Sequence, residues 1–159
     1  MCDPNFGPIY MPHDKHRGYF GIGIQGVKNS HNTGTLWRSA YCLGANFIFT
    51  IGERYQNQCS DTTKSYRHIP YWRMNSLMDF HDHIPYDCQV VGIESTDEAV
   101  DLRNFVHPER CMYVLGPEDG SLSKELVDMC QYIVKIDSRY CLNVAVAGSI
   151  VMYDRACKG

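Results

Sequence analysis

The chain of 159 residues has few features that would place it in a membrane or in an oxidising compartment. Its longest apolar stretch, residues 144–153, contains Gly148 and Ser149 and is shorter than the roughly 20 residues that a membrane-spanning helix needs. The first twenty residues contain no basic segment followed by an apolar run, so we expect no secretory signal and predict that the protein acts in the cytoplasm. No internal repeat is visible, and no linker is long enough to divide the chain.

The eight cysteines contain no Cys-x-x-Cys pair, and several lie in apolar runs such as residues 111–115. We interpret them as reduced, buried thiols that behave as small hydrophobic side chains. His81-x-His83 is the only hint of a zinc site, and no spaced cysteine pair accompanies it. The sequence therefore predicts no metal site.

The formal net charge is only −3, which excludes crude electrostatic capture of nucleic acid, but the charge is unevenly distributed. Residues 1–75 carry a net charge of +4 and residues 76–159 a net charge of −7. In the basic half, arginines and lysines alternate with aromatic residues, a mixture that suits phosphates and stacked bases. The same mixture would also suit a solvated surface with aromatic side chains packed beneath it. The candidate RNA-binding residues of this half are Arg54, Lys64 and Arg67.

The hydrophobic pattern predicts an α/β fold with a parallel sheet covered by helices on both faces. Residues 1–17 are rich in proline, aspartate and histidine and are expected to form an extended arm, followed by a single domain at 18–159. The expected strands are continuously apolar and alternate with helices, which is typical of parallel sheets. The expected strands are residues 19–24, 46–51, 66–72, 89–93, 112–115 and 132–136, and the expected helices are residues 35–44, 96–105, 122–130 and 142–157.

Ligands of such sheets bind at the carboxyl ends of the strands. We therefore expect the chemistry in the loops after Ile24, Ile51, Ile93, Leu115 and Ile136, most of which are polar or contain glycine. The candidate RNA-binding residues lie in or beside the loop after Ile51, so we expect them at the same edge.

One motif points to a different class of function. Gly21-Ile-Gly-Ile-Gln-Gly26 fits the Gly-x-Gly-x-x-Gly pattern of dinucleotide-binding enzymes. That pattern needs its glycines in the turn after a strand, whereas Gly21 and Gly23 lie inside the expected strand. A nicotinamide-dependent enzyme is therefore a weak alternative, which dinucleotide binding would support.

Three other segments suggest a site. Asn32-Thr-Gly-Thr-Leu-Trp-Arg38 supplies a helix N-cap and an arginine on the polar face of the second turn. Leu115-Gly-Pro-Glu118-Asp-Gly120 takes a strand into a glycine-containing loop in which a ligand can approach the backbone. Cys141-Leu-Asn143-Val-Ala-Val-Ala147 opens a helix of small residues, and Asn143 could either point toward the strand ends or cap the helix.

The order and spacing of these segments resemble the three motifs of the SpoU (TrmH-like) RNA 2′-O-ribose methyltransferases of the SPOUT superfamily. The resemblance spans about residues 19–157, in a minimal single-domain form. It implies a deep C-terminal trefoil knot, although knots are rare exceptions among protein folds. It also implies a homodimer with active sites at the subunit interface, and S-adenosylmethionine as the cofactor.

Carried over by motif, the resemblance assigns roles to individual residues. The polar catalytic group would consist of Asn32, Arg38, Glu118 and Asn143. The cofactor contacts would be Gly116, Ile136 and Leu142, together with Cys141 and Ile93.

The chain departs from the family pattern at Cys141, where relatives usually carry serine. A thiol is a weaker hydrogen-bond partner than a hydroxyl. This difference leaves open a non-catalytic RNA-binding module with the same fold, and also a cysteine nucleophile, for which no activating base is visible. The main expectation is an enzyme that methylates a ribose 2′-hydroxyl of tRNA or rRNA, with no membrane or metal partner.

Overall fold

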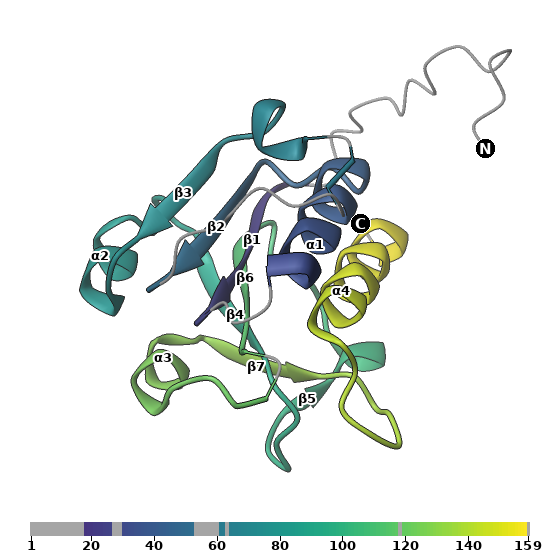
Figure 1. Ribbon diagram of the computed structural model, residues 1–159. Helices are drawn as coiled ribbons and strands as arrows, with labels where there is room; N and C mark the ends of the chain where they lie inside the picture. Colours follow the sequence, from purple (N-terminus) through teal and green to yellow (C-terminus); the bar gives the residue numbers. More distant parts are fainter. Residues whose placement is uncertain (1–17, 27–29, 53–60, 63, 118, 159) are drawn as a thin grey trace, which may run out of the picture.

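A computed structural model describes residues 18–26, 30–52, 61–62, 64–117 and 119–158. Over these ranges, seven strands form one parallel sheet in the order β3-β2-β1-β6-β4-β7-β5 (Figure 1). The arm expected at residues 1–17 lies outside them. The strands are β1 (Tyr19–Gln25), β2 (Phe47–Ile51), β3 (Tyr71–Met74), β4 (Gln89–Ile93), β5 (Val100–Asp101), β6 (Arg110–Leu115) and β7 (Tyr132–Lys135).

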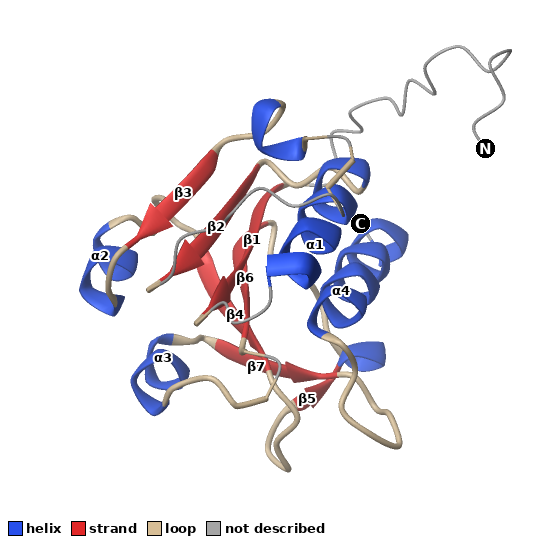
Figure 2. Cartoon of the chain, viewed as in Figure 1, coloured by secondary structure: helices blue, strands red, loops and turns tan. Residues whose placement is uncertain are grey.

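Two helices cover each face of the sheet (Figure 2). On one face, α1 (Ser30–Cys42) and α4 (Val144–Lys158) pack over a core that contains Trp37 and Val151. On the other face, α2 (Leu77–Asp82) and α3 (Lys124–Met129) pack over a second core. The predicted doubly covered parallel sheet is therefore confirmed.

The strands are uniformly apolar because both of their faces are buried. All five residues of β2 are buried, and successive side chains enter opposite cores. Phe47 and Phe49 contact the α2/α3 core, whereas Ile48 contacts the α1/α4 core.

The two glycines of the apparent dinucleotide motif serve packing within the sheet. Gly21 and Gly23 lie inside β1, as expected from the sequence. A Cβ at Gly21 would lie 2.2 Å from the ring of Phe47, and one at Gly23 would lie 2.3 Å from the ring of Phe49. The glycines therefore make room for two phenylalanines of β2 and form no phosphate-binding turn.

The prediction of a helix at residues 96–105 is wrong. That segment contains β5 and a short 3-10 turn, η2 (Leu102–Asn104). The carboxylate of Asp101 accepts a hydrogen bond from the backbone N–H of Arg103 at 2.8 Å, and such local bonds compete with a regular helix. Leu102 and Phe105 are buried and lie three residues apart, a spacing that is also typical of one face of a helix.

The strand expected at residues 66–72 is displaced. A 3-10 turn, η1 (Ser65–Arg67), precedes β3, which begins at Tyr71. Helix α2 was not expected, because only one of its six residues, Phe80, is buried and no period can be recognised. Its start is nevertheless encoded locally: Ser76 accepts a hydrogen bond from Asp79 N at 3.1 Å.

The prediction that the cysteines are buried is confirmed for only some of the described cysteines. Cys88 and Cys111 are buried, and burial raises the pKa of Cys88 to about 11. Cys42, Cys141 and Cys157 are exposed, against expectation. All the cysteines of the described residues are free thiols.

Candidate functional site

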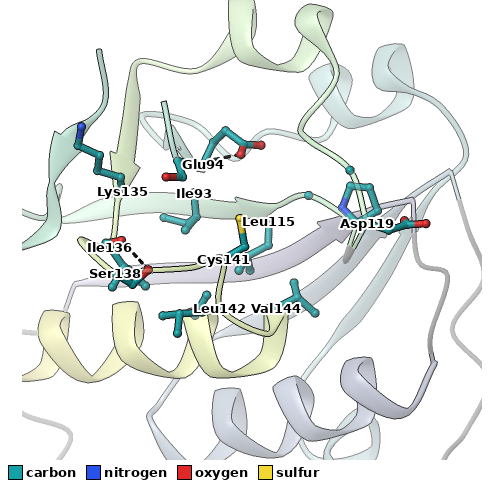
Figure 3. A pocket seen from close by; sticks show the side chains of 15 residues that line it. Ile93, Glu94, Leu115, Asp119, Lys135, Ile136, Ser138, Cys141, Leu142 and Val144 are labelled. Carbon is teal, nitrogen blue, oxygen red and sulfur yellow. Dashed lines mark hydrogen bonds between the residues drawn. The ribbon is translucent and has the colours of Figure 1, made fainter. Parts of the chain in front are cut away.

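A pocket of about 240 Å³ opens at the carboxyl edge of the sheet, where β4, β6 and β7 end. Its walls come from three segments far apart in the sequence: the ends of β4 and β6 with their following loops, and the segment from the end of β7 into α4 (Figure 3). This is the edge at which the sequence predicts the chemistry. The lining residues are Ile93, Glu94, Ser95, Leu115, Gly116, Pro117, Asp119, Gly120, Lys135, Ile136, Ser138, Cys141, Leu142, Val144 and Ala147.

All five residues that the sequence assigned to cofactor contacts line this one pocket. They are Ile93, Gly116, Ile136, Cys141 and Leu142. Glycine at 116 allows a close approach of two backbone segments, since a Cβ there would lie 3.1 Å from the backbone nitrogen of Leu122. The structure thus brings together residues up to 49 positions apart, and their binding role remains a prediction.

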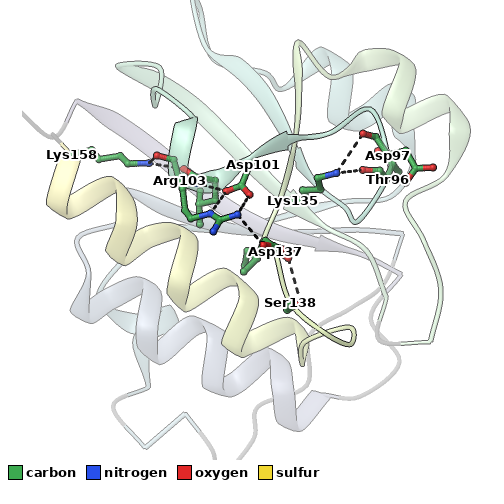
Figure 4. Close-up of polar contacts among 10 residues, drawn as sticks. Thr96, Asp97, Asp101, Arg103, Lys135, Asp137, Ser138 and Lys158 are labelled. Carbon is green, nitrogen blue, oxygen red and sulfur yellow. Dashed lines mark hydrogen bonds and ion pairs between the residues drawn. The ribbon is translucent and has the colours of Figure 1, made fainter.

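Polar contacts hold the loops that form the pocket walls (Figure 4). The ammonium of Lys135 donates to the backbone oxygen of Thr96 at 3.1 Å. Arg103 bridges Asp101 at the end of β5 and Asp137 after β7, with a distance of 2.9 Å from Nη2 to Asp137 Oδ2. The hydrogen bonds from Arg103 lower the pKa of Asp101 to about 2. These ion pairs are exposed, so they position the loops more than they stabilise the fold.

Sequence reasoning missed three charged side chains of the pocket. Glu94, Asp119 and Lys135 line it but were not candidates. Glu94 directly follows β4, so the rule that ligands bind at carboxyl edges could have found it. Two carboxylates and one ammonium, set among apolar walls, suit a ligand that carries an apolar ring and charges of both signs.

Among the described residues, the predicted catalytic residues Asn32, Arg38 and Asn143 do not line the pocket. Asn32 and Arg38 are on α1, and Arg38 is exposed. Asn143 immediately precedes α4, and its Oδ1 accepts hydrogen bonds from Ala145 N at 2.9 Å and Val146 N at 3.4 Å. Its side-chain oxygen is therefore occupied as a helix cap, which was the second of the two expectations from sequence. Glu118 lies outside the described residues.

Helices α1 and α4 pack directly against each other, with the second turn of α4 against the middle of α1. Gly148 faces Leu36, and a Cβ at Gly148 would lie 2.4 Å from Leu36 Cδ1. Ser149 Oγ donates to Ser39 Oγ at 2.8 Å. This close packing is what the small residues of the third motif predict.

The expected position of two RNA-binding candidates is wrong. Lys64 and Arg67 were expected at the carboxyl edge, in or beside the loop after Ile51, but Lys64 precedes η1 and Arg67 ends it. The turn leads into the amino end of β3 and lies beside α1 (Figure 1). The reason is topological: β2 and β3 are parallel, so the chain must return to the amino edge before β3 begins. Arg54 lies outside the described residues.

Two negative findings concern the described part of the chain. None of its helices combines the length and apolar character required to cross a membrane. In the same residues, no group of three or more histidine, cysteine, aspartate or glutamate side chains could hold a metal ion, so His81 and His83 have no further ligand.

The family model of the SpoU rRNA methylases matches residues 20–153. The chain belongs to this family. The match includes all three sequence motifs and every strand except the first residue of β1, so the resemblance found from the motifs is confirmed.

Individual SpoU relatives support this assignment at low identity. A protein of Staphylococcus haemolyticus described as a TrmH family tRNA/rRNA methyltransferase is 25% identical over 138 residues, which cover 82% of this chain and 55% of the relative. The chain thus spans about half the length of the curated relatives it matches.

Solved structures of SpoU proteins share the fold. The AdoMet-bound rRNA methyltransferase from Sinorhizobium meliloti aligns with a TM-score of 0.76 and 25% identity, covering 88% of this chain and 56% of that one. The TrmH/SpoU tRNA modifying enzyme of A. aeolicus aligns with a TM-score of 0.78 and 20% identity, covering 87% and 74% respectively.

Proposed function

We propose that this protein transfers a methyl group from S-adenosylmethionine to a ribose 2′-hydroxyl of tRNA or rRNA. One observation carries the proposal: five residues assigned to cofactor contacts by their place in the SpoU motifs line a single pocket. They come from three separate segments of a chain that belongs to the SpoU family. An RNA substrate of this kind implies action in the cytoplasm.

The pocket fits the proposed cofactor in chemistry. Ile93, Ile136 and Leu142 would enclose the adenine ring, and the backbone beside Gly116 is open to close approach because no side chain stands there. Asp119, a further carboxylate of the lining, would favour the positive charges of S-adenosylmethionine. When bound, the cofactor supplies an electrophilic methyl group on a sulfonium.

The residues of the chain would then hold the acceptor in line with that group. Alignment alone contributes about 7–11 kcal/mol when the bound geometry is close to that of attack. A guanidinium stays protonated at neutral pH, so Arg38 would serve as a hydrogen-bond donor to the developing oxyanion or to a phosphate. The ribose proton would leave to water, and Asn32 would help to orient the acceptor.

We infer that two copies of the chain pair through the groove between α1 and α4. This groove, of about 340 Å³, is mostly apolar and is lined by Thr35, Ala145, Val146, Ser149, Ile150 and Tyr153. Val146 is 47% exposed and Tyr153 is 64% exposed, and apolar surface of this kind marks contact sites. Pairing there would let the partner subunit's Arg38 approach the pocket, which this chain's own Arg38 does not line.

RNA would bind through the basic N-terminal half. Lys64 and Arg67 are exposed, and the Arg67 guanidinium lies 6.0 Å from the centre of the Tyr66 ring. At about 3.3 Å per residue, the five residues of β2 set the two sheet edges about 16 Å apart. A folded RNA would span that distance, so these residues would contact backbone phosphates remote from the methylated ribose. Arg54, which lies outside the described residues, stays a candidate RNA contact from its sequence alone.

We further infer the C-terminal trefoil knot of the SpoU proteins. Support comes from the adjacent positions of β6, β4 and β7 in the sheet and from the convergence of their following segments on one pocket.

The experiment that tests the function is mass-spectrometric mapping of ribose methylation in RNA from cells with and without the gene. The proposal expects one or a few 2′-O-methyl positions to disappear and to return with the wild-type gene but not with an Arg38→Ala gene. Full restoration by the Arg38→Ala gene would contradict the catalytic role of Arg38. An unchanged ribose methylation pattern would favour the alternative, a non-catalytic RNA-binding module.

A further inference from the structure

Two side chains from neighbouring strands converge on the loop that follows β6. In the sheet order, β6 lies between β1 and β4, and all three strands run parallel. Gln25 is the last residue of β1, and Glu94 directly follows β4. Both therefore stand at the carboxyl edge, one on each side of the loop that runs from Gly116 to α3.

The contacts are made to two consecutive backbone N–H groups. The Glu94 carboxylate accepts from Leu122 N at 2.8 Å, and the Gln25 amide oxygen accepts from Ser123 N at 2.9 Å. The Gln25 amide nitrogen also donates to Ser123 Oγ at 2.7 Å. Ser123 in turn caps α3 by accepting from Leu126 N at 3.3 Å. The three residues thus fix where the loop ends and where the helix begins.

The end of the loop packs behind Gly116, which is part of the pocket wall. Leu122 is 6% exposed, and its backbone nitrogen lies where a Cβ at Gly116 would come within 3.1 Å. Gly116 itself lines the pocket, as does Glu94 (Figure 3). A shift of Leu122 would therefore move the wall against which a ligand rests.

We propose that Gln25 and Glu94 are positioning residues that hold Leu122 and Ser123 behind Gly116, so that the pocket keeps the shape that receives the cofactor. The inference rests on the proposed function only in taking the ligand to be S-adenosylmethionine. Glu94 acts through its acceptor oxygen on Leu122 N, and its negative charge is secondary. The competing role for Glu94 is direct contact with the positive sulfonium, since the carboxylate lines the pocket.

Matched variants separate these roles. Glu94→Gln keeps an oxygen for Leu122 N, removes the charge and gives up only the weaker bond from Ser95 N at 3.1 Å. Glu94→Ala removes both bonds. Gln25→Met removes the hydrogen bonds to Ser123 and leaves every pocket-lining residue unchanged. Glu98→Ala is the control, because Glu98 is an exposed carboxylate that does not line the pocket.

The measurements are calorimetric affinities for S-adenosylmethionine and for its product S-adenosylhomocysteine, which lacks the sulfonium charge. We expect Glu94→Ala and Gln25→Met to weaken both ligands by a similar factor of ten or more. Glu94→Gln and Glu98→Ala should stay within about threefold of wild type for both. If Glu94→Gln loses S-adenosylmethionine affinity as strongly as Glu94→Ala while both keep S-adenosylhomocysteine affinity, Glu94 is a direct charge contact and the proposal is wrong.

Amide hydrogen exchange of the ligand-free protein gives a readout that needs neither cofactor nor activity. Exchange at Leu122 and Ser123 should be at least tenfold faster in Gln25→Met and Glu94→Ala than in wild type, and nearly unchanged in Glu94→Gln. Wild-type exchange rates in Gln25→Met would overturn the positioning role. Failure of the wild-type protein to bind S-adenosylmethionine would instead refute the proposed function, and the exchange experiment would still test the loop contacts.

Discussion

Cys141 is the residue at which this chain departs from the SpoU pattern, and it lies on the pocket wall with an exposed side chain. The departure leaves the surrounding geometry intact, because Leu142 and Val144 beside it also line the pocket. The thiol therefore acts as a wall of the pocket, and the residue's volume matters more than its chemistry.

Cys141→Ser should retain at least a third of wild-type methyl transfer, because serine has a similar volume and is the usual residue of the family. Alkylation of Cys141 should abolish cofactor binding by filling the pocket. Steady-state rates and cofactor affinity of the serine variant check this, with Cys157→Ser as a control at another exposed thiol. A covalent RNA adduct at Cys141, or complete loss of turnover in Cys141→Ser, would show that the thiol is a nucleophile.

Arg38 is exposed on α1 and is absent from the pocket wall, which places it on the acceptor side of the proposed reaction. Arg38→Ala should lower kcat by a hundredfold or more and leave S-adenosylmethionine affinity within a few-fold. Single-turnover kinetics and calorimetry measure the two quantities. Loss of cofactor affinity in parallel with activity would mean that Arg38 belongs to the cofactor site.

At the scale of elements, the hydrophobic pattern predicted the sheet well because buried parallel strands are continuously apolar. β2 and β4 were expected to within one residue at each end, and α1 and α4 overlap their predicted ranges. The failures are short elements decided by local hydrogen bonds. β5 and η2 depend on Asp101 and Arg103, and α2 depends on the Ser76 cap.

The site, like the fold, was predicted where it depends on the strands and missed where it depends on the loops. The cofactor contacts follow strand ends, so the sequence places them at one edge. Glu94, Asp119 and Lys135 were missed because their roles arise from loops that converge only in three dimensions. Lys64 and Arg67 were misplaced because the sequence does not show how far the β2–β3 connection has returned along the sheet.

The C-terminal half of α4 is joined to the segment before β6 by a buried polar network. His107 Nε2 donates to Asp154 at 2.8 Å, and His107 Nδ1 accepts from the Tyr113 hydroxyl at 2.6 Å. That hydroxyl accepts from Arg155 at 3.0 Å, and Lys158 also pairs with Asp154 at 2.8 Å. These directions are those of the neutral imidazole with its proton on Nε2.

His107 should make the stability of the protein depend on pH. Burial, and to a lesser extent the positive charges of Arg155 and Lys158, outweigh Asp154 and lower the pKa of His107 below its ordinary value of 6.5. The unfolded chain then binds more protons, so the free energy of unfolding should be fully maintained above pH 6.5 and fall as the pH drops below it.

His107→Gln should remove that slope and cost about 1–3 kcal/mol of stability at pH 8 through weakened buried hydrogen bonds. Urea unfolding between pH 5 and pH 8 is the measurement, with the exposed His83→Gln as a control. An unchanged slope between pH 5 and 6.5 in His107→Gln would assign the dependence to other groups.

At the scale of the whole molecule, the apolar groove between α1 and α4 should be the contact between two copies. Ile150→Asp places a charge in this groove and should convert a micromolar dimer into monomers, with methyl transfer reduced at least tenfold and cofactor affinity little changed. Analytical ultracentrifugation measures the assembly state. Met78→Asp, at an exposed position on α2, is the matched control and should remain dimeric. A wild-type protein that is monomeric at micromolar concentration and fully active would contradict the dimer.

The central claim is that the pocket at the carboxyl edge delivers a methyl group to a ribose oxygen. Its most direct test is incubation of the purified protein with unmodified tRNA and rRNA and S-adenosylmethionine that carries a deuterated methyl group. The RNA is then digested to nucleosides for mass spectrometry. The label should be found only on ribose, and the labelled phosphodiester should resist alkali because its 2′-oxygen can no longer attack the phosphate. Label on a base, or label on ribose that is equally abundant with the Arg38→Ala protein, would contradict the account.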